Sequence, residues 1–293
     1  MRKQFVKTVE NILENNKDVI LLLGDIGIFN FRKSFKDFPD RVYNIGILEQ
    51  STIGMAAGLA TCNLIPIVHT IAPFLIERSL EQLKLDFCYQ KLGGNFVSVG
   101  ASYDYAALGC SHHCPGDIGE LMNLPEMEII IPGTAKEFDI LFNQSYDNGH
   151  PTYYRLSENS NNFDFPVKFG KAKIIKKGKK ATIIAVGPLL DKVIEACKNL
   201  DVTILYYTTI YPFDKNTLKN NCESGKIFLC EPYYEGQLVA EIIKTLKPKP
   251  ITIDFIGVPC KFLRKYGTAK EHDKSINLTI KNIETRIKKL IYG

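Results

Sequence analysis

Glu49 is the only charged side chain in a stretch of small and uncharged residues, GILEQSTIGMAAGLA at 46–60. We expect a strand over 42–44 to end at Gly46 and Glu49 to open a helix whose small side chains let it lie close to a flat group, either a backbone or a ring. A carboxylate held there is poorly solvated and can share a proton with a ligand nitrogen. The structural alternative is an acid that caps a buried helix through its dipole. The small residues are Gly54, Ala57, Gly58 and Ala60.

Histidine and cysteine side chains gather in a second segment, CSHHC at 110–114. Thiolates and imidazoles are zinc ligands, but this spacing fits no standard zinc finger, and adjacent side chains on an extended loop point in different directions. His69 and Asp25 are further candidates because each ends a predicted strand, and open α/β sheets place ligands at the carboxyl ends of strands. Either can equally be structural, His69 as a hydrogen-bonded core histidine and Asp25 as a turn acid.

The elements that must position these side chains alternate between buried strands and amphipathic helices. In the first half, strands are expected at 19–25, 42–44, 64–71, 95–100, 128–133 and 151–156. Helices are expected at 3–16, from Glu49, at 73–91 and from Ala135. This alternation predicts an α/β fold with a doubly wound, mostly parallel sheet.

The polar, irregular residues 157–167 separate this unit from a second alternation of strands and helices. Strands of the second unit are expected at 179–187, 202–208, 226–231 and 251–257, with a last helix at 275–291. We therefore predict two doubly wound, mostly parallel-sheet α/β domains, at 1–158 and 169–293, joined by a linker at 159–168.

Composition is that of an ordinary globular protein, with 45% hydrophobic and 24% charged residues and a formal net charge of +5. The lysine-rich runs are not interleaved with aromatic residues as single-strand binding requires, so no nucleic-acid partner is expected. The longest apolar run, at 19–23, is too short to span a membrane, and no signal-peptide pattern opens the chain. Eight scattered cysteines without a C-x-x-C pair indicate reduced thiols and a cytoplasmic protein.

Several motifs in a common order resemble the C-terminal half of transketolase and of deoxyxylulose-phosphate synthase over essentially the whole chain. GILEQSTIGMAAGLA is similar to the segment that carries the cofactor-activating glutamate of these thiamine-diphosphate enzymes. HTIAPFLIERSLEQLKLD (69–86) is similar to the segment that stacks on the cofactor's aminopyrimidine, and GCSHHCPGDIGELMNLPEMEIIIPG (109–133) to the segment with the substrate histidine. The second half adds YPFDKNTL (211–218), KIFLCEPYYEGQL (226–238) and YGTAKEH (266–272). The implied fold is a pyrimidine-binding domain followed by a transketolase C-terminal domain.

The resemblance implies roles for individual residues. Glu49 would bond the pyrimidine ring of thiamine diphosphate and so promote loss of the thiazolium proton. Phe74 would stack on the pyrimidine, unless it is simply a core aromatic residue, and Asp25 and Ile47 would also contact the cofactor. His113 would bond substrate oxygens during proton transfers. The implied substrate-binding residues are His69, His112, His113 and Arg155.

The first departure from the family is length. Full transketolases have an N-terminal domain with a Gly-Asp-Gly…Asn motif that holds magnesium and the diphosphate, whereas GDIG at 24–27 lacks the second acid and the asparagine. The resemblance therefore implies a partner subunit of the transketolase N-terminal type. It implies an α2β2 heterotetramer with cofactors at the interfaces, Mg²⁺ ligands from the partner, and no metal ligand in this chain.

Other departures concern the substrate. Where deoxyxylulose-phosphate synthases read R-Y-P-R, this chain reads RLSE at 155–158, so Glu158 replaces a phosphate-binding arginine unless the alignment slips and Arg155 takes the role. A carboxylate repels a phosphate. Gly109 stands where transketolases have a substrate-orienting aspartate, and Phe29 where the family has a serine. We expect a substrate other than an ordinary terminal sugar phosphate, such as a nucleotide-linked or unphosphorylated sugar.

The predicted function is that of the C-terminal subunit of a split transketolase-like enzyme, which transfers a two-carbon ketol unit between sugars and is active only with its partner. The alternatives are the beta subunit of a 2-oxo acid dehydrogenase and a non-catalytic assembly subunit. Glu49 argues against the last of these, because the fold alone requires no acid in that helix.

Overall fold

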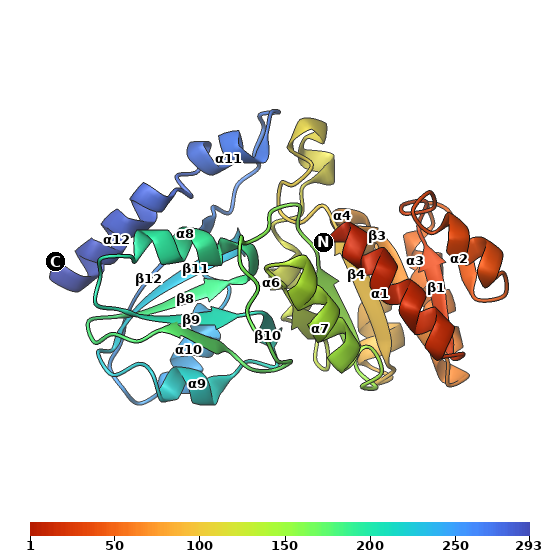
Figure 1. The fold of residues 1–293 in the computed structure, drawn as a ribbon, viewed down its shortest axis with the longest axis horizontal. Coiled ribbons are helices and arrows are strands. Elements are labelled where there is room, and N and C mark those ends of the chain that lie inside the picture. The colour runs from red at the N-terminus through yellow and green to blue at the C-terminus, as the bar shows by residue number, and fades with distance from the viewer.

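The computed structural model describes residues 1–293 and contains two sheets, each with helices on both faces (Figure 1). The strands of the first sheet are β1 (Val19–Leu23), β2 (Val42–Asn44), β3 (Ile65–Ile71), β4 (Gly94–Val99), β5 (Glu128–Ile130), β6 (Pro151–Arg155) and β10 (Thr209–Tyr211). Their order is β10-β5-β6-β4-β3-β1-β2, and all neighbours are parallel except β10 and β5.

The second sheet follows the same plan with one antiparallel edge strand. Its strands are β7 (Lys173–Lys176), β8 (Thr182–Val186), β9 (Thr203–Tyr207), β11 (Lys226–Tyr234) and β12 (Thr252–Val258). The order is β12-β11-β8-β9-β7, and only β7 runs antiparallel to its neighbour. The prediction of two mostly parallel α/β sheets is confirmed.

Alternate residues of the buried strands face different helices, as the pleat of a strand requires. Leu21 of β1 packs in a hydrophobic cluster with the first helix and α7, whereas Leu22 packs in a second cluster with α3 on the opposite face. Helices α1 and α7 contact each other (Figure 1). The helices of the first half are α1 (Arg2–Asn15), α2 (Arg32–Asp37), α3 (Glu49–Thr61), α4 (Ala72–Leu75), α5 (Leu80–Gln82), the π-helix η1 (Leu83–Cys88), η2 (Ala106–Leu108), η3 (Cys110–His112), α6 (Asp117–Leu121) and α7 (Ala135–Ser145).

In the second half, α8 packs against the C-terminal helix α12 on one side of the sheet, and α9 packs against α10 (Figure 1). These helices are η4 (Gly187–Leu189), α8 (Leu190–Ala196), α9 (Lys215–Lys219), α10 (Val239–Leu246), α11 (Ala269–Ser275) and α12 (Ile280–Tyr292). None of the helices combines the length and apolar character needed to cross a bilayer.

The two halves are interlocked. β10 lies beyond the predicted linker, yet it joins the first sheet, with Thr209 opposite Ile130 and Tyr211 opposite Ile129. Each hydrophobic cluster also contains side chains from both halves, for example Phe5 with Phe228. The domain division at 159–168 stays a prediction, while the packing across it is continuous.

The helix predicted at 73–91 is broken into α4, a turn, α5 and the π-helix η1. At the break, the hydroxyl group of Ser79 donates to the carbonyl oxygen of Leu75 at 2.5 Å, and the backbone N–H of Arg78 donates to Pro73 five residues back at 3.3 Å. This wider backbone path takes the Arg78 side chain back toward α4 instead of along a continuous helix face.

Candidate active site

Four side chains form a continuous row, which we call the Glu49 cluster: Glu49, Arg78, Phe74 and His112. Glu49 begins α3, is 5% exposed, and accepts from Nη1 of Arg78, which lies 3.3 Å from each carboxylate oxygen. The Arg78 guanidinium also covers the ring of Phe74, with Cζ 3.9 Å from the ring centroid. Phe74 meets His112 edge-on, with ring centroids 5.3 Å apart. The structure therefore brings three predicted site residues together, and Arg78 links them.

Sequence reasoning did not identify Arg78. It lies four residues after Phe74 in the 69–86 segment, a spacing that places two side chains on one face of a helix. Its contact with Glu49 joins positions far apart in the chain, so the pairing appears only in the fold. The guanidinium compensates a carboxylate that would otherwise be buried without a partner.

Helix α3 buries one face and leaves the other open. Ala57 packs in the hydrophobic cluster beneath the helix, but Gly54 and Gly58 are exposed, and no other part of the chain comes within 4 Å of a Cβ built on Gly58. Around them are Ile47, which is 65% exposed, and Met55, which is 49% exposed. The small-residue face predicted for this helix is therefore uncovered within this chain.

His113 lies at the junction of the two halves, against His272 of α11. The two imidazole rings meet edge-on, with centroids 5.4 Å apart. Burial, with smaller contributions from His272 and His112, lowers the pKa of His113, so its ring is neutral near pH 7. Although His113 is only 6% exposed, neither of its ring nitrogens has a hydrogen-bond partner within the chain. Buried polar atoms without partners are costly, which makes this imidazole a candidate for binding a hydroxylated ligand.

His272 is a second site residue that sequence reasoning missed, although it ends the YGTAKEH segment. It is 3% exposed, and its Nε2 atom has no partner. The ring of Tyr103 lies 5.3 Å from it, and the Tyr103 hydroxyl donates to Asp273 at 2.6 Å. These contacts fix α11 against the His113 loop, so the second half contributes directly to the site.

Arg155 is not available to a substrate, which corrects the role predicted for it. Its side chain is 1% exposed, and Nε donates to Asp117 at 2.7 Å. Nη2 donates to the hydroxyl oxygen of Ser102 at 2.8 Å and to the carbonyl oxygen of Cys114 at 3.2 Å. Nη1 donates to the carbonyl oxygen of Pro232 in the second half at 3.4 Å. The guanidinium thus ties the two halves together and has no free surface for a phosphate.

The buried ion pair has acidic neighbours. Burial, together with the carboxylates of Glu77 and Asp117, raises the pKa of Glu120 to about 7. On the other side of Arg155, burial raises the pKa of Asp104 to about 7, and Asp104 accepts from the backbone N–H of Glu158 at 2.9 Å. These groups disfavour an anion in both places.

The family of the chain is shown by comparison with known proteins. Residues 1–162 match the family model for the transketolase pyrimidine binding domain, and residues 170–273 match the model for the transketolase C-terminal domain. The chain belongs to the transketolase family. The resemblance drawn from the sequence motifs is thereby confirmed.

Relatives of this transketolase-family chain include separate subunits. It is 37% identical to an uncharacterised 33.6 kDa protein of the fasciation locus of Rhodococcoides fascians, over 97% of this chain and 92% of that protein. It is 30% identical to the B-type chain of the apulose-4-phosphate transketolase of Phocaeicola vulgatus, over 88% of this chain and 87% of that one. A solved split-gene transketolase, described as an inactive beta4 tetramer, has the same fold, with a TM-score of 0.87, 24% identity and coverage of 99% and 97%.

The family's aspartate position is occupied differently in this transketolase-family chain. Gly109 has a φ of +77°, which favours glycine, and a Cβ built on it would lie 2.7 Å from Cε1 of Tyr266. An aspartate at this position would be strained and would collide with the tyrosine ring. The departure seen in the sequence therefore accompanies a local repacking in which Tyr266 of the second half covers the loop.

His69 lies in the core of this transketolase-family chain. It has no exposed surface, its Nδ1 donates to the carbonyl oxygen of Val97 at 2.8 Å, and the Phe5 ring lies 4.5 Å away. Burial lowers its pKa to about 4. Of the two roles left open by the sequence, the geometry favours the core histidine over a substrate ligand, because no part of the ring can be reached.

Asp25 and Ile47 are at the carboxyl edge of the first sheet, but neither contacts the Glu49 cluster. The backbone N–H of Asp25 donates to Oδ1 of Asn44 at 3.0 Å, and the Asn44 amide returns a bond to Asp25 Oδ1 at 3.3 Å. The exposed Phe29 lies under the guanidinium of Arg32. Cofactor contacts by Asp25 and Ile47 stay predictions.

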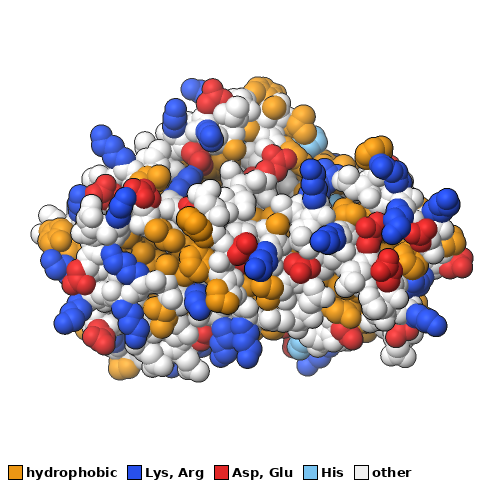
Figure 2. Space-filling model, in the orientation of Figure 1, with side chains coloured by type: hydrophobic (Ala, Val, Ile, Leu, Met, Phe, Trp, Pro, Cys, Tyr) orange, Lys and Arg blue, Asp and Glu red, His pale blue; other side chains and the backbone are white.

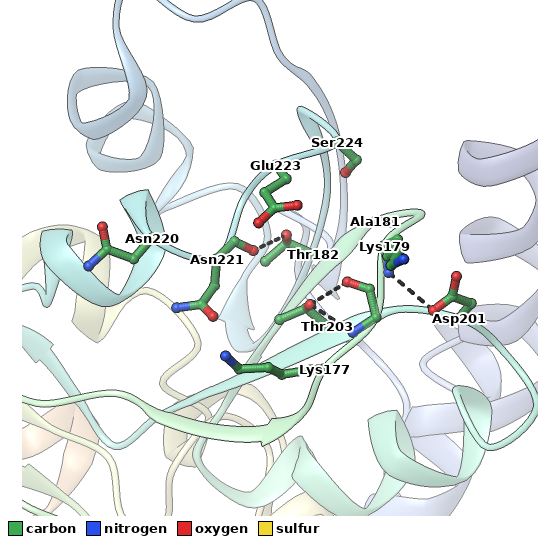
Figure 3. Close-up of a pocket in the computed structure, with 11 residues that line it drawn as sticks. Lys177, Lys179, Ala181, Thr182, Asp201, Thr203, Asn220, Asn221, Glu223 and Ser224 are labelled. Atoms are coloured by element: carbon green, nitrogen blue, oxygen red, sulfur yellow. Dashed lines mark hydrogen bonds between the residues drawn. The ribbon is translucent and has the colours of Figure 1, made fainter.

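The largest cavity is elsewhere, at the amino ends of the second sheet's strands (Figure 3). It has a volume of about 330 Å³ and lies between Lys177, Thr203 and Asn221. Its polar groups bond one another, as in the pair of bonds between Thr203 and Gly178 at 2.7 and 3.1 Å. Parallel sheets place ligands at the carboxyl ends of strands, so this cavity is not the candidate site.

The CSHHC loop is not arranged as a zinc site. His112 faces Phe74, whereas His113 faces His272, so the adjacent imidazoles diverge as expected. No group of three or more His, Cys, Asp or Glu side chains in the structure is placed to hold a metal ion. All eight cysteines are free thiols.

Proposed function

We propose that this chain is the C-terminal subunit of a split transketolase-like enzyme that transfers a two-carbon ketol unit between sugars. The observation that carries the proposal is the Glu49 cluster. A buried carboxylate at the start of a helix, an aromatic ring and an imidazole stand in one row at the carboxyl edge of the first sheet. A purely structural domain has no need of this arrangement.

The cluster fits the aminopyrimidine end of thiamine diphosphate. The cofactor supplies the carbanion-stabilising chemistry that a ketol transfer requires. Glu49 would hold a proton shared with a ring nitrogen, and Phe74 would pack against the ring face. Arg78 covers that face and neutralises Glu49, so its guanidinium must turn aside or share the carboxylate when the ring binds. His113, neutral and without hydrogen-bond partners, would bond substrate oxygens.

We propose that a diphosphate-binding partner completes the site and supplies the Mg²⁺ ligands, in an α2β2 heterotetramer. Two observations support this proposal. Two relatives that match this chain over most of their own length carry names that make them one component of a multi-chain transketolase, and the exposed face of α3 is apolar beside Glu49. Gly54 and Gly58 would let a partner's backbone approach this face closely. We also propose a cytoplasmic location, which the eight free thiols support.

For the substrate we propose a sugar other than an ordinary terminal sugar phosphate. The reconstituted enzyme is expected to convert xylulose 5-phosphate with ribose 5-phosphate at a kcat/KM below about 10³ M⁻¹s⁻¹, under the usual range for good substrates. The reason is that Glu158 and Asp104 oppose a phosphate while Arg155 is buried. Efficient turnover of this pair would refute the proposal.

A charge-reversed variant makes that test specific. Glu158 is exposed and only its backbone is bonded to Asp104, so Glu158→Arg should fold normally. It is expected to raise kcat/KM for the sugar phosphates by about fivefold, the size of an exposed ion pair gained and a repulsion removed. The exposed Glu195→Arg on α8 is the control and should change nothing.

A further inference from the structure

The loop between β12 and α11, residues 259–267, which we call the rim loop, extends from the second half over the His113 segment. In Figure 1 the two segments lie side by side at the top of the molecule. Tyr266 packs on Gly109, and Lys261, Phe262 and Leu263 line a small cavity of about 90 Å³ together with His113. The rim loop is therefore a wall of the candidate site and is formed entirely by the second half.

The rim loop carries three cations and two aromatic rings on its surface. Lys261, Arg264 and Lys265 are exposed, and none of them forms an ion pair in the structure. Phe262 is 70% exposed and Tyr266 is 71% exposed. Figure 2 shows hydrophobic side chains and Lys or Arg side chains close together at the top of the view. Such a mixture is costly to leave in water and suits a ligand that is both anionic and aromatic.

The other walls of the site exclude an anion. Glu77 lines the same cavity as the rim loop, and Glu120 beside it has a raised pKa near 7 because of burial and neighbouring carboxylates. Glu158 replaces a cation near Asp104, and Arg155 is enclosed by its ion pair with Asp117. Cations without partners are therefore found at the rim and not in the floor of the site. A negatively charged part of a substrate would lie at the outer end, away from the imidazoles.

We propose that the rim loop binds the nucleoside diphosphate portion of a nucleotide-linked sugar, so that the sugar reaches His113 and His272. This inference rests on the function proposed above and names its substrate class. Lys261, Arg264 and Lys265 contact the diphosphate oxygens, and the exposed ring of Phe262 stacks on the base. The unpartnered ring nitrogens of His113 and His272 then bond sugar hydroxyl groups.

The test uses the full chain assembled with its partner and saturated with thiamine diphosphate, so that the cofactor's own diphosphate site is filled. Calorimetry measures binding of UDP, CDP, ADP, pyrophosphate and ribose 5-phosphate. At least one nucleoside diphosphate is expected to bind about tenfold tighter than pyrophosphate or ribose 5-phosphate, because stacking adds to charge. The triple variant Lys261→Glu/Arg264→Glu/Lys265→Glu is expected to weaken that binding by about tenfold or more.

Matched controls separate charge from stacking. Lys244→Glu/Lys281→Glu/Lys289→Glu carries the same net charge change at exposed, unpaired lysines on α10 and α12 and should leave binding unchanged. Phe262→Ala should weaken the nucleotide about fivefold but not pyrophosphate, whereas Phe163→Ala, at a ring 68% exposed elsewhere, should affect neither. Thermal melting confirms that each variant folds.

Each outcome decides the matter. Nucleotide binding that the rim triple variant does not weaken overturns the proposal. Equal binding of pyrophosphate, ribose 5-phosphate and nucleotides, with no effect of Phe262→Ala, shows a bare phosphate site and also overturns it. If the assembled enzyme turns over a ketose while ignoring every nucleotide, the rim inference fails and the proposed function stands. If it binds a nucleotide through the rim but never binds thiamine diphosphate, the proposed function fails.

Discussion

Replacing Glu49 with glutamine is expected to lower the turnover of the assembled enzyme by at least about a hundredfold, the usual contribution of a positioned acid or base. Glu49 is 5% exposed, and its carboxylate is the only acid in the Glu49 cluster. Glutamine keeps the size of the side chain but cannot hold and release the shared proton. Steady-state turnover of the pair of subunits, measured with saturating thiamine diphosphate, gives the result.

Two further measurements show whether the loss is chemical. Arg78 loses its partner in Glu49→Gln, so thermal melting must show that the fold remains. Glu81→Gln, at an exposed acid on the neighbouring helix α5, is the matched control and should retain full activity. If Glu49→Gln turned over sugars at the wild-type rate, the role assigned to this carboxylate would be wrong.

Replacing Arg155 with methionine is expected to destabilise the protein by about 3–5 kcal/mol, the usual consequence of removing one partner from a buried ion pair. Asp117 would be left charged and fully buried, although the Tyr153 hydroxyl would still donate to it at 2.8 Å. The contacts of Arg155 with Ser102 and Pro232, which join the two halves, would also be lost. Urea unfolding monitored by circular dichroism measures the change.

The ion pair of Arg286 with Asp254 provides the comparison, because each of its side chains is 33% exposed. Arg286→Met should destabilise by at most about 1 kcal/mol, since water screens this pair. The double variant Arg155→Met/Asp117→Leu should lose less than the sum of the two single variants, because no uncompensated charge remains. If Arg155→Met raised the KM for a substrate and left stability unchanged, Arg155 would be a substrate ligand after all.

Most strands could be predicted because buried parallel strands are continuous apolar runs. The run at 19–23 is a clear example, and β1 is fully buried along its length. The edge strands β7 and β10 were missed, since each pairs antiparallel at a sheet edge and lacks such a run. The segment 26–40 was taken as a loop but contains α2, a helix of six residues that is too short for a periodic pattern.

The break in the helix predicted at 73–91 has a tertiary cause. Residues 74–91 carry no proline or glycine that would end a helix. The bond from the Ser79 hydroxyl to Leu75 and the pull of Glu49 on Arg78 become visible only when α3 and α4 are adjacent. Local propensity therefore gave the correct type of element and the wrong continuity.

The candidate site was predictable in part for the same reason. Glu49, Phe74 and the two adjacent histidines lie in segments whose residue types are unusual on their own. Arg78 and His272 act through contacts with residues far away in the sequence, and Tyr266 matters because Gly109 leaves room for its ring. Arg155 was misassigned because a sequence does not show whether a cation ends a strand in the solvent or beneath another domain.

The central claim is that this chain holds half of a thiamine-diphosphate site. The most direct test is calorimetric binding of thiamine diphosphate with Mg²⁺ to this chain alone, to its copurified partner alone, and to the assembled pair. We expect binding by the assembled pair only, because this chain presents Glu49 and Phe74 to the pyrimidine ring but has no group of residues placed to hold a metal ion. Binding by this chain alone with the affinity of the pair would contradict the account.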